Sequence, residues 1–379
     1  AYARFNPLYR DRFAMRGNPA EHDAAGPTVF ATQSTHKLLA ALSQASYIHI
    51  RNGKKPIEHS RFNESYMLQS TTSPLYAIIA ANEIGAAMMD DQQGEALTQE
   101  VIDEAVDFRL ALAKVHAAFA AKGEWFFSPW NAPDVIDAET GKKVPFMSAS
   151  KEQLTTDPEC WVLRPGENWH GFEQLEDDWC MLDPIKAGIL VPGMGDDGEM
   201  QETGIPAAVV TAFLYQHGIV PSRTTDFMVL CLFSVGITKG KWGTLINVLI
   251  EFKKHYDSNT PLSVCLPDLA ASHAENYAGM GMKDLCDEMF AYMKTSQMDK
   301  LQAAAFSHIP TPVKLPRAAF QDHMAGRCEL LSLDKLAGRI SAVGVIPYPP
   351  GIPIVMPGES FGTTEQPWLQ YIYSIAKWG

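Results

Sequence analysis

Residues 28–37 read Thr28-Val29-Phe30-Ala31-Thr32-Gln33-Ser34-Thr35-His36-Lys37, and an apolar, alanine-rich run follows them as far as residue 46. Val29 and Phe30 favour a short β-strand. This predicted strand ends in a cluster of hydroxyl side chains, one imidazole and one lysine. We therefore expect Lys37 to lie on a bend at the end of a strand, and not on a solvated face.

A lysine beside small hydroxylated residues and a histidine is the pattern that a pyridoxal phosphate site requires. The amine forms a Schiff base with the cofactor aldehyde, while Ser and Thr hydroxyls and backbone N–H groups hold the phosphate. Most lysines, however, are solvated surface charges, and a loop lysine is the other interpretation of Ser34 to Lys37. Taken alone, these four residues leave both interpretations open.

Further motifs are distributed over the whole chain, from Ala1 to Gly379. They are Tyr2-Ala3-Arg4-Phe5-Asn6-Pro7, Phe62-Asn63-Glu64-Ser65-Tyr66-Met67, Thr71-Thr72-Ser73-Pro74, Trp169-His170-Gly171-Phe172, Leu182-Asp183-Pro184-Ile185-Lys186 and Pro347-Tyr348-Pro349-Pro350-Gly351-Ile352-Pro353. Together with Ser34-Thr35-His36-Lys37, in this order, the chain resembles the Orn/Lys/Arg decarboxylases of the aspartate aminotransferase fold. Within that family it is most similar to the acid-induced, biodegradative arginine-specific branch. The resemblance implies that Lys37 is the Schiff-base lysine.

The same resemblance implies an α/β fold in three parts. Residues 1–87 are expected to be the C-terminal part of a pyridoxal phosphate-binding large domain, and residues 88–256 an α/β small domain like that of aspartate aminotransferase. Residues 257–379 are expected to form an α+β C-terminal decarboxylase domain. The family pattern extends beyond both ends of the chain, so we expect a partial large domain and a truncated C-terminal domain.

Composition and hydropathy place the chain among globular proteins. It has 379 residues, 46% of them hydrophobic, which is enough for a core and suits two or three domains. No apolar run reaches the roughly 18 uncharged residues of a membrane span, and residues 1–6 lack the features of a signal peptide. We therefore expect a soluble, cytoplasmic protein.

Cysteine usage and net charge narrow the class of protein further. Six cysteines lack C-x-x-C spacing and indicate thiols of a reducing compartment: Cys160, Cys180, Cys231, Cys265, Cys286 and Cys328. The net charge of −13 argues against nucleic acid as a partner, because phosphate binding needs clustered Lys and Arg. It also predicts that copies of the chain repel one another at neutral pH.

The first third of the chain predicts a hairpin and several helices. Residues 47–50 form a predicted strand that residues 52–56 turn into a hairpin. Residues 60–90 predict two helices broken at residues 71–74, with Pro74 in the first turn and a preceding hydroxyl as N-cap. A long helix is predicted over residues 98–122, with Thr98 as its cap and Gly123 at its end.

The remainder of the chain alternates helices and strands. Residues 206–216 predict a helix ended by Gly218, residues 227–233 a buried strand, and residues 241–256 a further helix. Residues 340–356 contain several prolines and are therefore expected to be extended or turning. Strands that alternate with helices favour an α/β domain.

The resemblance assigns further residues to the cofactor. Thr71 and Thr72 match the phosphate contacts that the family sends across a dimer interface, although an ordinary cap before Pro74 is the alternative. Ser34 would contact the phosphate from the same chain as Lys37. His36 is either a supporting donor or a packed histidine bonded to backbone. A structural role in the small domain is the better interpretation of His170.

Other motifs are excluded by their chemistry. The loop Gly193 to Gly198 lacks the lysine of a phosphate-binding loop, and its aspartates would repel phosphate, so a turn is expected there. Residues 236–241 lack the spacing of a Walker motif, and no group of His, Cys and Glu has metal-ligand spacing. We predict no metal.

Substrate choice is predicted from the segment Val220-Pro221-Ser222-Arg223-Thr224-Thr225-Asp226. Lysine-specific relatives read like V-E-K-T-G at this position, whereas arginine-specific relatives read like V-P-T-R-T-T-D, the pattern of this chain. A planar guanidinium pairs with a carboxylate through two parallel hydrogen bonds. Asp226 is a candidate for that carboxylate, and a turn residue is the alternative.

The predicted function is therefore decarboxylation of L-arginine to agmatine and CO2 with pyridoxal phosphate, as a proton-consuming response to acid. The resemblance implies a homodimer with a shared active site, and a higher oligomer of dimers, a decamer, in acid. Lysine decarboxylase of the same family is one alternative. A non-catalytic fragment or assembly subunit is the other, because the segments for the pyridine nitrogen and ring stacking would precede Ala1.

Overall fold

The computed structural model describes residues 8, 19–38, 41–172, 174–177, 180–195, 198–348 and 351–378. The motif Tyr2 to Pro7 and the pair Pro349-Pro350 lie outside the described residues. Contacts divide the chain into two compact units. The first unit comprises residues 1–114, 131–187 and 232–243, and the second comprises residues 115–130, 188–231 and 244–379.

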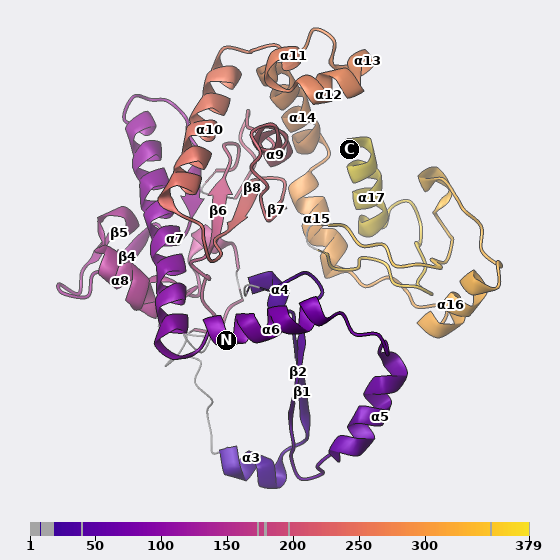
Figure 1. Ribbon diagram of the computed structural model, residues 1–379. Helices are drawn as coiled ribbons and strands as arrows, with labels where there is room; N and C mark the ends of the chain where they lie inside the picture. Colours follow the sequence, from indigo (N-terminus) through magenta and orange to yellow (C-terminus); the bar gives the residue numbers. More distant parts are fainter. Residues whose placement is uncertain are drawn as a thin grey trace. The chain divides into compact units, whose positions relative to one another are not determined.

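The chain mixes helices and short strands throughout (Figure 1), which confirms the α/β fold class. The first elements are α3 (Pro19–Ala25), β1 (Val29–Gln33), α4 (Thr35–Leu38), β2 (Tyr47–Arg51), α5 (His59–Gln69), α6 (Tyr76–Met88) and α7 (Asp91–Ala120). They are followed by β3 (Ser128–Trp130), β4 (Asp134–Ile136), β5 (Lys143–Pro145), η1 (Phe146–Ser148), α8 (Lys151–Thr156), η2 (Pro158–Cys160), η3 (Asn168–His170) and β6 (Lys186–Leu190).

The second half of the chain is predominantly helical. Its elements are α9 (Ala207–Gln216), β7 (Arg223–Thr224), β8 (Met228–Leu232), α10 (Lys239–Asp257), α11 (Leu262–Cys265), α12 (Pro267–Ser272), α13 (Ala274–Tyr277), α14 (Met282–Thr295), α15 (Met298–Ser307), α16 (Pro316–Met324), η4 (Leu333–Lys335) and α17 (Pro367–Trp378). The helices predicted at residues 206–216 and 241–256, and the strand at 227–233, are confirmed. Between residues 340 and 356 the described backbone has turns and an isolated bridge from Val345 to Val355, as the prolines predict.

Strands β1 and β2 form an antiparallel hairpin in which Val29 pairs with Arg51 and Gln33 with Tyr47. The predicted hairpin turn at residues 52–56 is therefore wrong, because β2 pairs with the strand before it and the connection contains α4. Residues 52–56 instead fold back on the start of β1. Lys54 N donates to Gly26 O over 2.9 Å, and a Cβ on Gly53 would lie 2.2 Å from the same oxygen.

The break between α5 and α6 lies where the sequence predicts it, but the predicted cap is wrong. Helix α6 begins at Tyr76, its N-cap residue is Leu75, and no side chain caps it. Pro74 therefore precedes the helix and is not in its first turn. Thr71 Oγ1 accepts a hydrogen bond from Ser73 N over 3.1 Å, so this hydroxyl closes a local turn.

Helix α7 carries the core of the first unit. Phe108 is fully buried and lies 5.4 Å from the ring of Phe233 and 6.3 Å from that of Trp242, between ring centroids. The helix begins seven residues before the predicted start, and Thr98 is no cap, since its hydroxyl donates to Gly94 O within the helix over 2.8 Å. Gly123 does follow its end, with a φ of 72°.

Arg109 is a fully buried cation in the first unit. Its guanidinium donates to Lys186 O over 2.9 Å and to Pro184 O over 3.2 Å, and it lies 5.3 Å from the centre of the Trp161 ring. Burial lowers the pKa of Arg109 to about 10, an effect that the charge of Asp183 opposes. Arg109 thus ties α7 to the start of β6 while remaining charged.

Four of the described strands form a sheet in the order β3-β6-β8-β7. Strands β3 and β6 are antiparallel, as are β7 and β8. Gly188 in β6 permits close packing, because a Cβ there would lie 2.6 Å from Met228 Sδ and 3.0 Å from Trp130 Cβ. A larger residue at position 188 would therefore require the Met228 side chain to move.

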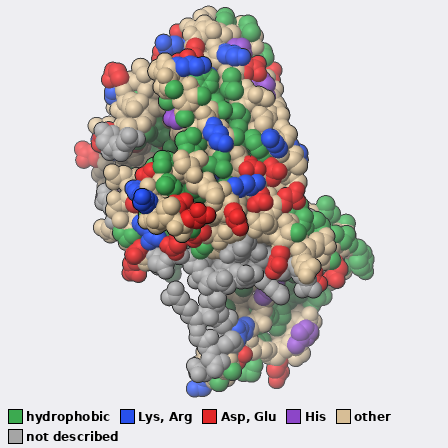
Figure 2. Space-filling view, turned by 90° about the vertical axis from the view of Figure 1, so that its left-hand side faces the viewer, with side chains coloured by type: hydrophobic (Ala, Val, Ile, Leu, Met, Phe, Trp, Pro, Cys, Tyr) green, Lys and Arg blue, Asp and Glu red, His purple; other side chains and the backbone are tan. Residues whose placement is uncertain are grey.

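The described surface mixes charged and apolar side chains. On the face drawn in Figure 2, carboxylates and basic side chains alternate, with hydrophobic side chains between them.

All six cysteines have free thiols. Three of them are buried (Cys160, Cys265 and Cys286), two are half-buried (Cys180 and Cys231), and Cys328 is exposed. Among the helices of the described ranges, none combines the length and the apolar character that crossing a bilayer demands.

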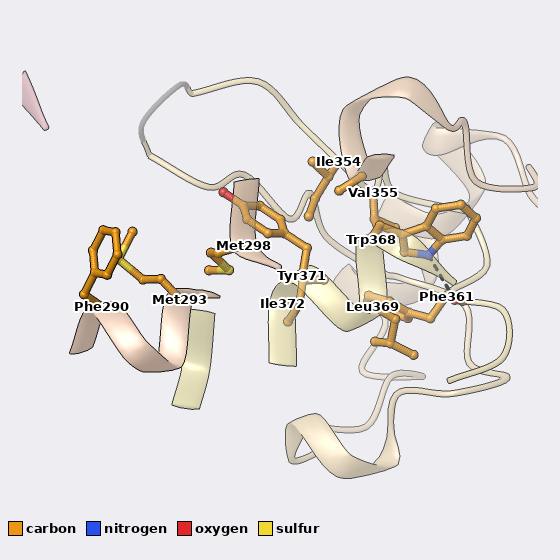
Figure 3. Close-up of a cluster of buried hydrophobic side chains, with 11 residues drawn as sticks. Phe290, Met293, Met298, Ile354, Val355, Phe361, Trp368, Leu369, Tyr371 and Ile372 are labelled. Carbon is orange, nitrogen blue, oxygen red and sulfur yellow. Dashed lines mark hydrogen bonds between the residues drawn. The ribbon is translucent and has the colours of Figure 1, made fainter. Parts of the chain in front are cut away.

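The C-terminal helices pack around a hydrophobic core in the second unit (Figure 3). Phe290 and Met293 of α14 belong to this core, as do Leu369 and Ile372 of α17. Trp368 is buried within it and donates from its indole N–H to Phe361 O over 3.0 Å, which satisfies the one polar atom of the ring. The extended segment before α17 is thereby fixed to the helix.

Candidate active site

Lys37 is the third residue of α4, directly after the β1 strand. Its side chain is exposed, and within the described residues no carboxylate or acceptor engages its amine. The expectation that Lys37 avoids a solvated face is therefore wrong for the single chain. The reason is that α4 is only one turn long and packs on one side, through the buried Thr35, which is 4% exposed.

His36 is half-buried beside Lys37. Its Nδ1 lies 3.0 Å from Ala45 O, so the neutral ring donates from Nδ1 to the backbone. This is the bond expected of a packed histidine, and it leaves Nε2 for another partner. Gln44, with a φ of 76°, forms the turn that presents Ala45 O to the imidazole.

The predicted phosphate ligands lie in two places. Ser34 is exposed just before α4, and its backbone O accepts from Lys37 N over 3.3 Å. Thr71 and Thr72 are exposed between α5 and α6. Within the part of the chain that the structure describes, no hydrogen bond joins Thr71 or Thr72 to residues 34–37, so the single chain does not bring the two groups together.

Asp226 lies in a cavity of about 750 Å³ in the second unit. The cavity is lined mainly by apolar and aromatic side chains, and Asp226 and Asp299 are its two carboxylates. Tyr371 also faces it, and its hydroxyl accepts from Gln302 Nε2 over 3.1 Å. Arg223, three residues before Asp226, lies over the Tyr348 ring, with its Cζ 5.3 Å from the ring centre.

The environment of Asp226 disfavours the charged form of its carboxyl group. Burial raises its pKa to about 6, and the neighbouring charge of Asp299 acts in the same direction. Among the described residues, Asp226 forms no ion pair, whereas Asp299 lies close enough to Lys300 for their charges to interact, although the Lys300 amine pairs with Glu199 Oε2 over 3.1 Å. A cation that entered the cavity would therefore gain from both carboxylates.

Comparison with known proteins identifies the family. The sequence model of the Orn/Lys/Arg decarboxylase major domain matches residues 1–241, and that of the family's C-terminal domain matches residues 299–379. The chain belongs to the Orn/Lys/Arg decarboxylase family. It is 55% identical over 377 residues to the biodegradative arginine decarboxylase of Escherichia coli K12, covering 100% of this chain and 50% of the relative.

Other members of the family are lysine decarboxylases. The Pseudomonas aeruginosa enzyme is 40% identical over 373 residues, covering 98% of this chain and 47% of its own length. The structure of the E. coli constitutive lysine decarboxylase matches with a TM-score of 0.84 at 36% identity, over 100% of this chain and 49% of the other. The chain thus spans about half the length of the relatives it matches. The predicted fold and family are confirmed.

The chemistry of both groups of predicted residues suits pyridoxal phosphate. The Lys37 amine is accessible for a covalent bond to an aldehyde, Ser34 offers an exposed hydroxyl beside it, and Thr72 offers one in the separate turn before α6. Helix α6 begins without a side-chain cap, so its first backbone N–H groups can bind an anion. A lysine amine, hydroxyls and free N–H groups are the donors that pyridoxal phosphate requires.

His170 has the contacts of a structural residue. Its Nε2 lies 3.0 Å from Arg164 O, and its Nδ1 accepts from Phe172 N over 3.1 Å. Both ring nitrogens are therefore engaged by backbone.

The loop from Gly193 to Gly198 has the backbone of a turn, as predicted. Both end glycines have positive φ, while Asp196 and Asp197 lie outside the described residues.

Two groups of site residues were not predicted from the sequence. Asn82 contacts Thr35 from α6, and Asp299 shares the cavity of Asp226 from α15. For the first, the available signal was a polar Asn directly after the apolar run 77–81. Nothing local to Asp299 indicated a carboxylate 73 positions away, and only the folded chain brings the two together.

Proposed function

We propose that the protein to which this chain belongs decarboxylates L-arginine to agmatine and CO2 with pyridoxal phosphate, and so consumes protons under acid stress. The observation that carries the proposal is Lys37, whose amine is accessible at the end of β1 within the motif Ser34 to Lys37. The 55% identity to an arginine decarboxylase supports the same function.

Each proposed site residue has a distinct task. When bound, pyridoxal phosphate supplies an electron-withdrawing ring that accepts the electron pair left as CO2 departs. Lys37 binds the cofactor aldehyde through Nζ, Ser34 donates to the phosphate, and His36 supports this site through the nitrogen that its backbone bond leaves free. Lys37 Nζ or a neighbouring acid delivers the proton that replaces CO2.

We also propose that Thr71 and Thr72 hold the phosphate bound by a partner subunit, so that the active site is shared in a homodimer. The exposed apolar residues of this region support a covered surface. Leu68 is 81% exposed and Tyr76 is 78% exposed, on α5 and α6, and Leu75 between them is also exposed. Burying side chains of this size is the main source of free energy in a stable dimer.

The proposed protein consists of three parts, residues 1–87, 88–256 and 257–379, and it works in the cytoplasm. The matches to a major-domain model over residues 1–241 and a C-terminal model over residues 299–379 support a separate C-terminal domain. Six free thiols support a reducing compartment.

Arginine is the proposed substrate, and Asp226 is the proposed partner of its guanidinium. Asp226 shares an aromatic-lined cavity with Asp299, and Asp226 forms no ion pair among the described residues. A guanidinium is planar, is weakly hydrated and stacks on aromatic rings, so it suits this cavity better than an ammonium does. Mismatch at a site built for one hydrogen-bonding group can support discrimination of roughly 10⁴.

The test of Lys37 is reduction with borohydride in the presence of pyridoxal phosphate, followed by peptide mass mapping. We expect the modified peptide to contain Lys37, and we expect Lys37→Ala to lower kcat by several orders of magnitude. Lys54→Ala is the matched control, because Lys54 is exposed in the same region. Near-normal turnover by the Lys37→Ala protein would contradict the proposal.

The test of substrate choice is CO2 release from arginine, lysine and ornithine at equal concentration. We expect arginine to have the highest kcat/KM. A higher value for lysine would favour the lysine alternative, which rests on relatives at 36 to 40% identity. Absence of turnover with every substrate, together with an unmodified Lys37, would favour a non-catalytic assembly subunit.

A further inference from the structure

Three side chains hold the short helix that carries Lys37, and we name them the Asn82 clamp: Thr35, Tyr47 and Asn82. Thr35 Oγ1 donates to Asn82 Oδ1 over 2.5 Å, and the Tyr47 hydroxyl donates to the backbone O of Asn82 over 2.6 Å. Asn82 Nδ2 donates to Ser46 O over 3.4 Å. One residue of α6 therefore links the start of α4 to the start of β2.

Helix α4 needs support from outside itself. It has four residues, a single turn, and forming one turn costs more conformational entropy than its hydrogen bonds return. Thr35 is buried and its hydrogen bond to the half-buried Asn82 is partly shielded from water, which strengthens the bond, and its loss would leave the Asn82 acceptor without this donor. His36 adds a second attachment at Ala45 O. The backbone at Lys37 is thus fixed from two sides.

We infer that Asn82 and Thr35 are positioning residues for Lys37. They hold the backbone of α4, and so limit the directions in which the Lys37 amine can reach the cofactor. Neither is assigned a contact with substrate, and both act through α4. The inference rests on the proposed function, because Lys37 needs a fixed direction only if it binds a cofactor covalently.

The first test compares Thr35→Val, which keeps the shape of the side chain and removes the donor, with Thr35→Ser, which keeps the donor. Both are made in the full protein. We expect Thr35→Val to weaken pyridoxal phosphate binding roughly tenfold, the effect of one partly buried hydrogen bond, and Thr35→Ser to stay within about twofold. Visible circular dichroism of the bound cofactor should weaken in Thr35→Val and recover in Thr35→Ser.

Two further variants keep the inference falsifiable if Thr35→Val fails to fold. Tyr47→Phe removes one bond to Asn82 and retains the ring, and we expect it to weaken cofactor binding about threefold. Thr32→Val is the control, since Thr32 is exposed on β1 and makes no hydrogen bond to Asn82. Thermal unfolding of every variant separates a loss of position from a loss of fold.

The outcomes distinguish this inference from the proposed function. A Lys37 adduct that forms with equal affinity and equal circular dichroism in all variants would overturn the inference alone. So would failure of Thr35→Ser to recover what Thr35→Val loses. If the unaltered protein captures no pyridoxal phosphate at Lys37, the proposed function fails, and the inference fails with it.

Discussion

Lys253 shows how a charged side chain is buried in the second unit. Its side chain is 5% exposed, its amine lies 2.5 Å from Asp257 Oδ2 and 3.2 Å from Glu124 Oε2, and it lies 4.8 Å from the centre of the Trp125 ring. Both carboxylates are nearly half exposed and remain hydrated if the lysine is lost. The interaction should therefore contribute moderately to stability.

We predict that Lys253→Met lowers the free energy of unfolding by about 1–2 kcal/mol, because it removes two ion pairs and two cation–π contacts, to Trp125 and Phe119. Urea denaturation followed by tryptophan fluorescence measures this change. Lys254→Met is the matched control: Lys254 is exposed on the same helix, and its substitution should stay within about 0.5 kcal/mol. Equal effects of the two substitutions would show that the buried contacts add nothing.

Asp226 gives a prediction about pH. Its pKa is raised to about 6 from 3.8, so the folded state binds its proton more tightly than the unfolded state does. The stability that it contributes is therefore fully present below about pH 4 and lost as the pH rises through 6. Asp226→Asn should remove this loss and raise the free energy of unfolding at pH 7 by about 1–3 kcal/mol.

The measurement is urea unfolding of Asp226→Asn and the parent protein at several pH values between 4 and 7. The difference between the two should vanish near pH 4. Asp299→Asn should move the parent's pH dependence to lower pH, because Asp299 contributes to the raised pKa of Asp226. A difference that stays constant with pH would contradict the assignment.

At the scale of residues, a contiguous motif can be grouped from the sequence alone. Ser34, His36 and Lys37 are neighbours in the chain, and their grouping needs no folding. Asn82 lies 47 positions after Thr35, and its role depends on how α6 packs. A single sequence does not show which distant residues come into contact, so the Asn82 clamp was not predicted. The exposed position of Lys37 was missed for the same reason.

At the scale of elements, two glycines with open space around them should respond in opposite directions. Gly123 ends α7 with a φ of 72°, whereas Gly243 lies inside α10, and a Cβ at either position would meet nothing within 4 Å. We predict that Gly123→Ala destabilises the fold by about 1–2 kcal/mol, because alanine is strained at positive φ.

Gly243→Ala is the matched comparison and should stabilise the fold by about 0.5–1 kcal/mol, since alanine loses less backbone entropy in a helix. Thermal unfolding of both variants tests the pair. Destabilisation of the same size by both substitutions would mean that packing, and not backbone conformation, governs these positions.

Element types were predicted more reliably than their ends and partners. The apolar stripe of α7 predicted the helix, but the stripe starts at Val101 and gave no signal for the polar turns from Asp91 onward. Strand β2 was predicted, yet its partner was not, because the turn residues 52–56 imitate a hairpin connection. Pairing is a tertiary property, and strand patterns alone do not assign it.

At the scale of the whole molecule, the net charge of −13 predicts acid-dependent association. Carboxylates lie among exposed apolar side chains on the face in Figure 2, so repulsion opposes contact between apolar surfaces at neutral pH. Protonation near carboxylate pKa values of about 4 to 5 relieves this repulsion. Sedimentation velocity should show larger species as the pH falls from 7 to 5, and less so in high salt.

One sedimenting species across this range would contradict the prediction. An equal response in high salt would point to a conformational cause, because screening weakens interactions between exposed charges.

The fold class was predictable at this scale because the order of motifs along the full chain depends little on individual contacts. The proximity of Asp226 and Asp299 was not predictable, because it depends on how α15 packs in the folded chain.

Cys328 is the exposed thiol among six cysteines, and the other five are buried or half-buried. A maleimide dye added briefly to the native protein should therefore react mainly with Cys328. Energy transfer between dyes on separate copies would then report assembly in real time, without any engineered residue. The protein should be stored with a reducing agent, because oxidation of Cys328 on two copies would join them through an intermolecular disulfide.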